Sequence, residues 1–206
     1  MQEIEAKFYL QDLNQMRVRL QLTQARLLHD RVFEQNLRFD LPDNGLRAKG
    51  SVMRLRRDDE IRLTYKGAQT NTGGVLSRTE IEFAVDDLDM TKRFLEALGY
   101  QVMLEYEKFR TTFALSDTVH VMLDELPYGN FIEIEAETVE SVHAAADSLD
   151  LTRIRAIAKS YTDLFEHAKK ELGLNFRDLT FENFNGIAVQ AAHLGVEPAD
   201  EANQPT

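Results

Sequence analysis

The chain has 206 residues, a length that suits one domain with a substantial hydrophobic core. It has no cysteine, which excludes disulfides, thiolate metal sites and a cysteine nucleophile, and fits a cytoplasmic location. The formal net charge of −11 argues against a general nucleic-acid binder, and the sequence predicts neither a membrane span nor a signal peptide.

The charge is unevenly distributed along the chain. Residues 44–66 carry seven basic against three acidic side chains, whereas residues 171–206 carry six acidic against one basic. A basic region therefore lies inside an acidic chain, so the net charge says little about the working site. Residues 186–206 are rich in Ala, Gly, Pro and acid, which predicts a flexible acidic tail after a domain that covers residues 1–185.

Strands dominate the first half of the chain. Asp12 can cap a helix that runs to about Leu28, and Asp86 or Asp87 can cap a second helix that ends at Gly99. Alternation of polar and apolar residues predicts strands at residues 2–10, 32–39, 52–57, 61–67 and 78–83.

The second half predicts three more strands, followed by helices. The strands are expected at residues 102–113, 118–123 and 131–136, and the helices at residues 138–149, 160–172 and 178–184. About eight strands, mostly joined by short turns, predict an α+β fold with an antiparallel sheet.

The polar faces of these strands carry pairs of identical charge two residues apart. Such neighbours repel unless an opposite charge lies across from them or binds between them. A solvated or salt-bridged sheet is one interpretation, and a sheet closed around a charged lumen is the other. That lumen could hold a hard cation on its carboxylates and a polyanion on its bases. The pairs are Glu3/Glu5, Arg54/Arg56, Glu80/Glu82, Lys108/Arg110 and Glu133/Glu135.

Several segments resemble, in chain order, the motifs of the CYTH domain, the family of triphosphate tunnel metalloenzymes. Glu3-x-Glu5-x-Lys7 is similar to the N-terminal signature of that family. Arg38 departs from the family pattern, which commonly has an aromatic residue there. Further resemblances are Phe39-Asp40, Arg54-Leu55-Arg56, Leu63-Thr64-Tyr65-Lys66-Gly67, Arg78-Thr79-Glu80-Ile81-Glu82, Glu107-Lys108-x-Arg110, Leu123-Asp124, Gly129-x-Phe131-x-Glu133-Ile134-Glu135 and Lys159-Ser160-Tyr161.

The resemblance implies an eight-stranded antiparallel β-barrel, a tunnel with a charged interior flanked by helices, that takes a triphosphate with Mg²⁺ or Mn²⁺. Lys7, Arg56 and Lys66 would be catalytic. The metal-side acids implied are Glu3, Glu5, Asp124, Glu133 and Glu135, with Glu80 and Glu82 as further inward candidates. The phosphate-binding bases implied are Lys7, Arg54, Arg56, Lys66, Lys108 and Arg110, with Arg78 and Lys159 near the tunnel mouth.

The expected function is metal-dependent hydrolysis of a triphosphate: inorganic triphosphate, or a small organic one such as thiamine triphosphate or a nucleotide. One alternative is a class IV adenylyl cyclase, which would form cyclic AMP and pyrophosphate from ATP. Another is a non-catalytic module that binds polyphosphate or nucleotide. The expected partner is a small-molecule triphosphate, with no nucleic acid and no membrane, and the family suggests a homodimer by analogy.

Overall fold

The computed structural model describes residues 2–201, with side chains from Ile4 onward. The strands are β1 (Gln2–Leu10), β2 (Arg26–Asp40), β3 (Val52–Arg57), β4 (Ile61–Lys66), β5 (Thr70–Thr72), β6 (Val75–Ala84), β7 (Gln101–Ser116), β8 (Val119–Leu126) and β9 (Gly129–Ala136). The helices are α1 (Leu13–Leu22), α2 (Gly45–Ala48), α3 (Leu88–Ala97), α4 (Val139–Ser148), η1 (Arg153–Arg155), α5 (Tyr161–Leu172) and α6 (Ala191–Leu194).

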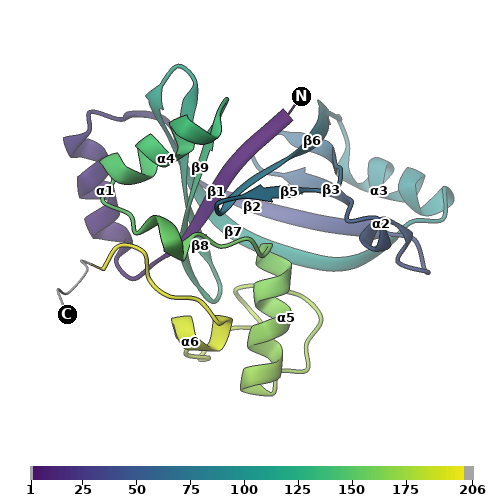
Figure 1. The fold of residues 1–206 in the computed structure, drawn as a ribbon. Coiled ribbons are helices and arrows are strands. Elements are labelled where there is room, and N and C mark those ends of the chain that lie inside the picture. The colour runs from purple at the N-terminus through teal and green to yellow at the C-terminus, as the bar shows by residue number, and fades with distance from the viewer. Residues whose placement is uncertain (1, 202–206) are drawn as a thin grey trace.

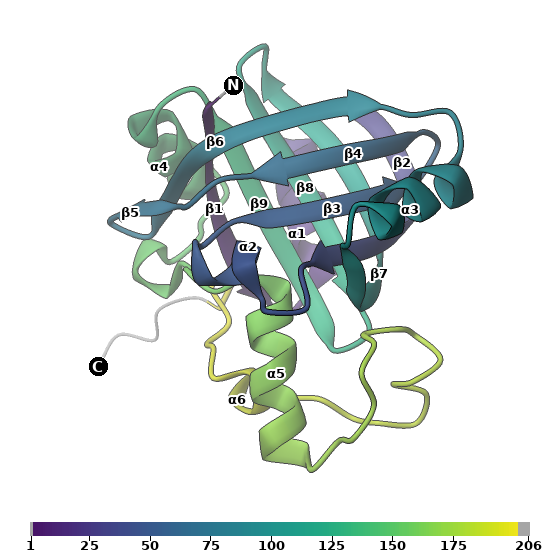
Figure 2. The same ribbon diagram turned by 90° about the vertical axis from the view of Figure 1, so that its right-hand side faces the viewer.

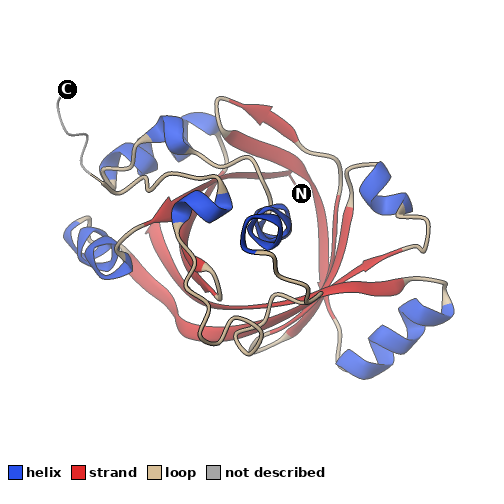
Figure 3. Ribbon diagram, turned by 90° about the horizontal axis from the view of Figure 1, so that it is seen from below, coloured by secondary structure: helices blue, strands red, loops and turns tan. Residues whose placement is uncertain are grey.

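The strands form one antiparallel sheet that closes on itself (Figure 3). The strand order is β1-β9-β8-β7-β2-β3-β4-β6, and an additional pairing of β1 with β6 completes the ring. The short strand β5 pairs with the start of β6. The predicted α+β fold with a closed antiparallel sheet is therefore confirmed. The ring is uneven rather than a regular barrel, because β1 pairs with β9 over Glu5–Leu10 but with β6 only over Gln2–Glu5.

Alternation along each strand separates a charged inner face from an apolar outer face. On β9, Ile132 and Ile134 are fully buried outside the ring, whereas Glu133 and Glu135 line its interior. Helices α1 and α4 lie on one side of the ring and α3 on another (Figures 1 and 2). Outward side chains such as Ile132 and Ile134 are thereby removed from water, which stabilises the closed sheet, whereas Ile81 and Phe83 on β6 are exposed.

Helix α5 stands below the ring and is seen end-on in front of its opening (Figure 3). Its N-terminus is fixed by a capping box between Ser160 and Asp163. Tyr161 packs edge-on against Phe131, and Phe165 lies in the same buried aromatic cluster. No helix between residues 2 and 201 combines the length and apolar character needed to cross a membrane.

Two predicted elements differ from the structure. The first helix ends at Leu22 rather than near Leu28, because Gln24 has a positive φ of 58° and Arg26 already pairs with β7, which lengthens β2. The segment 178–184 contains turns instead of a helix. Leu179 forms a bridge to Tyr106, so its backbone bonds to the sheet rather than within the segment.

The segment predicted as a flexible tail is packed along residues 186–201. Leu194 and Ala199 are fully buried, and the carboxylate of Asp200 accepts hydrogen bonds from the N–H groups of Gln11 (2.8 Å) and Asp12 (2.9 Å). Its content of Ala, Gly, Pro and acid suggested flexibility, but its few large apolar residues and Ala199 lie against α5 and β1. The expected tail is thus corrected for residues 186–201, and residues 202–206 lie outside the described part of the chain.

Asp200→Ala should lower the free energy of unfolding by about 1.5–3 kcal/mol, since the carboxylate is buried and accepts two backbone hydrogen bonds. Urea denaturation at pH 7 measures the change. Glu201→Ala is the matched control, because that residue is exposed, and it should behave like the wild type. Equal stability of all three proteins would contradict the packed C-terminal segment.

Candidate active site inside the tunnel

The ring encloses a cavity of about 660 Å³ that is lined mainly by charged side chains. Most of the residues implied by the family resemblance line this one cavity. The predicted bases on its wall are Lys7, Arg54, Arg56, Lys66, Arg78, Lys108 and Arg110. The acids on its wall are Glu5, Glu80, Glu82, Glu133 and Glu135.

Two predicted site residues are not on this wall, and the side chain of a third is not described. Lys159 is exposed just before α5, so it does not face the cavity. Asp124 is completely buried behind the bases rather than exposed to the cavity. Glu3 pairs with Arg78 through the backbone of β1 and β6, but its side chain lies outside the described residues.

Asp124 anchors two of the bases. Its Oδ2 accepts hydrogen bonds from Lys108 (2.9 Å), from Arg110 (2.6 Å) and from the hydroxyl of Tyr161 (2.8 Å), while Oδ1 accepts a second one from Arg110 (2.7 Å). Both oxygens are therefore occupied by protein donors. In the described structure Asp124 thus holds Lys108 and Arg110 in place, and its metal role stays a prediction.

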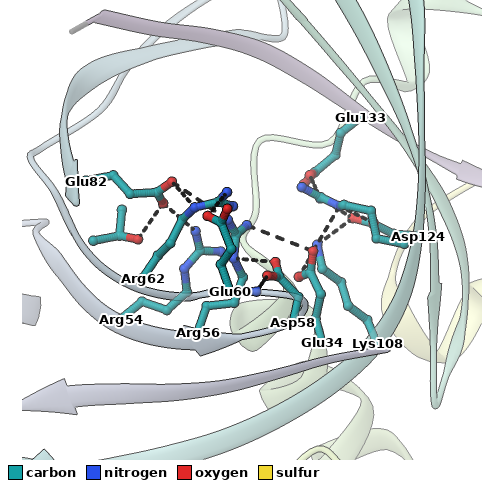
Figure 4. Close-up of polar contacts among 12 residues, drawn as sticks. Glu34, Arg54, Arg56, Asp58, Glu60, Arg62, Glu82, Lys108, Asp124 and Glu133 are labelled. Atoms are coloured by element: carbon teal, nitrogen blue, oxygen red, sulfur yellow. Dashed lines mark hydrogen bonds and ion pairs between the residues drawn. The ribbon is translucent and has the colours of Figure 1, made fainter. Parts of the chain in front are cut away.

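Glu34, which was not predicted from the sequence, lies among bases that line the cavity, such as Lys108 and Arg56 (Figure 4). It is 1% exposed, and its carboxylate lies 3.4 Å from Lys108 and 3.7 Å from Arg110. Burial acts to raise the pKa of this carboxyl group, but Lys108 and Arg110 outweigh it, and the pKa of Glu34 falls to about 2. Glu34 therefore stays ionised and holds the bases together.

Glu82 plays a similar part on the opposite strands. It accepts a hydrogen bond from Thr64 (2.7 Å) and lies 3.7 Å from both Arg54 and Arg56 (Figure 4). Glu80 likewise lies 3.3 Å from Lys66. These two acids thus lie beside bases, which favours an orienting role for them among the inward candidates.

The acids of β1 and β9 form the other wall. Glu5 and Glu135 are direct partners in the antiparallel pair, and both line the cavity. Like charges placed directly opposite each other repel, so a cation between them would be stabilising. Carboxylate oxygens are the ligands that hard divalent cations prefer, and these two residues therefore fit a metal ion.

Lys7 lies between the acidic wall and the aromatic cluster. Its ammonium is 3.1 Å from Glu133 and 4.2 Å from the ring centre of Tyr161. Burial acts to lower the pKa of Lys7, but Glu133 and Glu5 more than offset it and raise the pKa above its usual value. Burial also acts to raise the pKa of Glu133, yet Lys7 lowers it well below its usual value. Both groups are therefore charged at neutral pH.

Within the described residues, no group of three or more acidic, His or Cys side chains is arranged to hold a metal ion. In this state the carboxylates are paired with bases instead, as Glu5 is with Arg78 at 3.4 Å. A metal held by Glu5 and Glu135 would need further oxygen ligands from water or from the substrate, which is common for Mg²⁺.

Several residues that line the cavity were not predicted from the sequence to belong to the site. Arg38, Tyr106, Ser160, Tyr161 and Thr162 all line the wall. Arg38 and Glu34 are an even number of positions apart on β2, and Tyr106 is two positions before Lys108 on β7. Alternation along these strands could therefore have predicted that all three side chains point inward. The contributions of α5 depend on how that helix docks, which strand periodicity cannot reveal.

Comparison with known proteins places the fold in a family. The sequence model of the CYTH domain matches residues 1–163. The chain belongs to the CYTH domain family. The match covers the complete ring of strands and the first turn of α5, so the cavity lies within the CYTH domain. No curated protein sequence matches this CYTH protein.

Solved structures share this CYTH fold. A proposed adenylate cyclase from Vibrio parahaemolyticus is 20% identical over 80% of this chain and 97% of its own, with a TM-score of 0.72. PH1819 from Pyrococcus horikoshii is 23% identical over 80% and 98%, with a TM-score of 0.66. A Hippeastrum protein reported to have a dominant triphosphatase activity is 18% identical over 80% and 95%, with a TM-score of 0.59. These similarities establish the fold alone.

Glu34→Gln should remove a pH-dependent part of the stability of the CYTH domain. Because the folded-state pKa is depressed from 4.5 to about 2, Glu34 stabilises the fold above pH 4.5, and this contribution is lost as the pH falls toward 2. It amounts to something on the order of 3 kcal/mol. Urea denaturation between pH 7 and pH 3 should show a weaker acid dependence for Glu34→Gln, whereas the exposed control Glu96→Gln should follow the wild type. Identical pH profiles for Glu34→Gln and the wild type would be inconsistent with this arrangement.

Tyr161→Phe keeps the ring beside Lys7 but removes the hydrogen bond to Asp124. Since a hydrogen bond to a charged group is worth about 1.5–3 kcal/mol, the free energy of unfolding should fall by that amount. Chemical denaturation at pH 7 measures it, with Tyr100→Phe, outside the cavity wall, as the control. Unchanged stability of Tyr161→Phe would show that α5 is not anchored through Asp124.

Proposed function

We propose that this chain is a metal-dependent hydrolase that binds the triphosphate group of its substrate inside the tunnel. The proposed substrates are inorganic triphosphate or a small organic triphosphate such as thiamine triphosphate or a nucleotide. The observation that carries the proposal is a single cavity whose wall combines many Lys and Arg side chains with several carboxylates. Membership of the CYTH family agrees with a reaction on a phosphate anhydride.

The bases are suited to hold the phosphoryl oxygens. Arg54 and Arg56 offer planar forks that match two oxygens of one phosphoryl group, whereas Lys7, Lys66 and Lys108 act as point charges. Because phosphoryl transfer spreads negative charge over the equatorial oxygens, fixed cations at those oxygens stabilise the transition state. Lys7, Arg56 and Lys66 are the residues proposed to contact the reacting group.

The carboxylates of Glu5 and Glu135 would hold the divalent cation, Mg²⁺ or Mn²⁺, with Glu133 beside them. When bound, such an ion neutralises phosphate charge and lowers the pKa of a coordinated water, which becomes a better nucleophile. Asp124, Glu34 and Glu82 would hold the bases in position during the reaction through their ion pairs with them.

The products of the reaction test this proposal. The purified protein is incubated with Mg²⁺ or Mn²⁺ and inorganic triphosphate, thiamine triphosphate or ATP, and the products are separated by anion-exchange chromatography. Release of orthophosphate from one of these substrates, dependent on the divalent cation, is the expected result. Formation of cyclic AMP and pyrophosphate from ATP would replace hydrolysis by adenylyl cyclase activity, and no turnover of any substrate would indicate a binding module.

Glu5→Gln and Arg56→Ala should each lower kcat/KM by at least about 100-fold, the scale observed when a group that stabilises transition-state charge is removed. The exposed residues Glu140 and Arg57 provide matched controls, and Glu140→Gln and Arg57→Ala should retain wild-type rates. Circular dichroism establishes that each variant is folded. Near-normal rates for both site variants would contradict the assignment of these residues to the reaction.

A further inference from the structure

Arg38 is a cavity residue that departs from the family pattern. It lies on the inward face of β2, directly across from Arg54 of β3. Its guanidinium donates a hydrogen bond to the hydroxyl of Thr162, in the first turn of α5. Arg38 therefore lies where the first turn of α5 lines the cavity.

Arg38 differs from the other bases of the cavity in its distance from the nearest described carboxylate. Lys7, for example, lies 3.1 Å from Glu133, and Lys66 lies 3.3 Å from Glu80. Among the residues that the structure describes, no carboxylate lies within 4.0 Å of Arg38. The cavity bases that do have a carboxylate within that distance are Lys7, Arg54, Arg56, Lys66, Arg78, Lys108 and Arg110.

An arginine in this position is costly without an anion. Burial lowers the pKa of Arg38, which reports that water solvates the charge poorly. The hydroxyl of Thr162 supplies one acceptor, but a guanidinium has five N–H donors. Its planar fork matches two oxygens of a phosphoryl group. An anionic ligand would therefore satisfy donors that the protein leaves open.

We propose that Arg38 is a further substrate-binding residue, which takes the phosphoryl group at the α5 end of the bound triphosphate together with Arg54 and the hydroxyl of Thr162. The inference rests on the proposed function, since it concerns the same ligand. Because the first turn of α5 lines this end of the cavity, the group bound there is assigned as the terminal phosphoryl group. Any organic part of the substrate extends toward the opposite end of the tunnel.

Calorimetric titration with inorganic triphosphate tests the subsite without requiring turnover. Arg38→Gln should bind triphosphate about ten- to a hundredfold more weakly than the wild type, because it loses a charge-assisted contact. Arg57→Gln removes the same charge from an exposed site on β3 and should bind as the wild type does. Equal affinity of Arg38→Gln and the wild type would overturn the proposal.

A purely structural role for Arg38 predicts a different result. In that case Arg38→Gln and Thr162→Val would both lower the Tm of the ligand-free protein, and triphosphate affinity would be unchanged. The proposed role predicts that Arg38→Gln leaves the ligand-free Tm equal or higher, since a poorly solvated charge is removed, while the Tm increase caused by triphosphate shrinks. If the wild type binds triphosphate but releases no phosphate, the proposed hydrolase activity is wrong. The affinities of Arg38→Gln and the wild type then still test the Arg38 subsite. Absence of wild-type binding would overturn both.

Discussion

The structure depends on the neutralisation of charges inside a closed sheet. A buried charge without a partner is strongly destabilising, so a ring with so many charged side chains within it needs matched pairs. The antiparallel register supplies them, because Lys7 lies across from Glu133 and Lys66 lies across from Glu80. The apolar outer face and its covering helices close the ring, and the paired inner face makes that closure tolerable.

This pairing also explains how the same interior can receive a ligand. In the ligand-free state the carboxylates occupy the bases, as Glu133 does with Lys7 and Arg110. A triphosphate offers the bases an alternative anion, and a divalent cation offers the acids an alternative counter-ion. Binding then exchanges partners rather than exposing charges, which limits the desolvation cost. Asp124 is hydrogen-bonded on both oxygens and Glu34 is buried 3.4 Å from Lys108, so both are suited to stay in place.

The sequence predicts well which side chains lie on the inner face, but not which of them contact one another. Alternation identified Arg56, Lys108 and Glu133 because side-chain direction in a strand follows directly from parity. Which acid meets which base depends on register and closure, so the role of Asp124 as an anchor of Lys108 could not be read from spacing. Most of the acids predicted to hold metal are paired with bases in the folded chain for the same reason.

Other differences arise from contacts between segments distant in the sequence. The packing of residues 186–201 comes from a few buried side chains such as Leu194 and from the hydrogen bonds of Asp200, which average composition conceals. The contribution of Tyr161 depends on the docking of α5. That no described carboxylate lies within 4.0 Å of Arg38 is seen only once the fold places its neighbours.

A crystal structure of the protein with inorganic triphosphate and Mg²⁺ tests the central claim most directly. The triphosphate is expected to lie inside the ring, with its oxygens bonded to Arg56, Lys66 and Lys108. A triphosphate bound only on the outer surface, with the internal ion pairs intact, would contradict it.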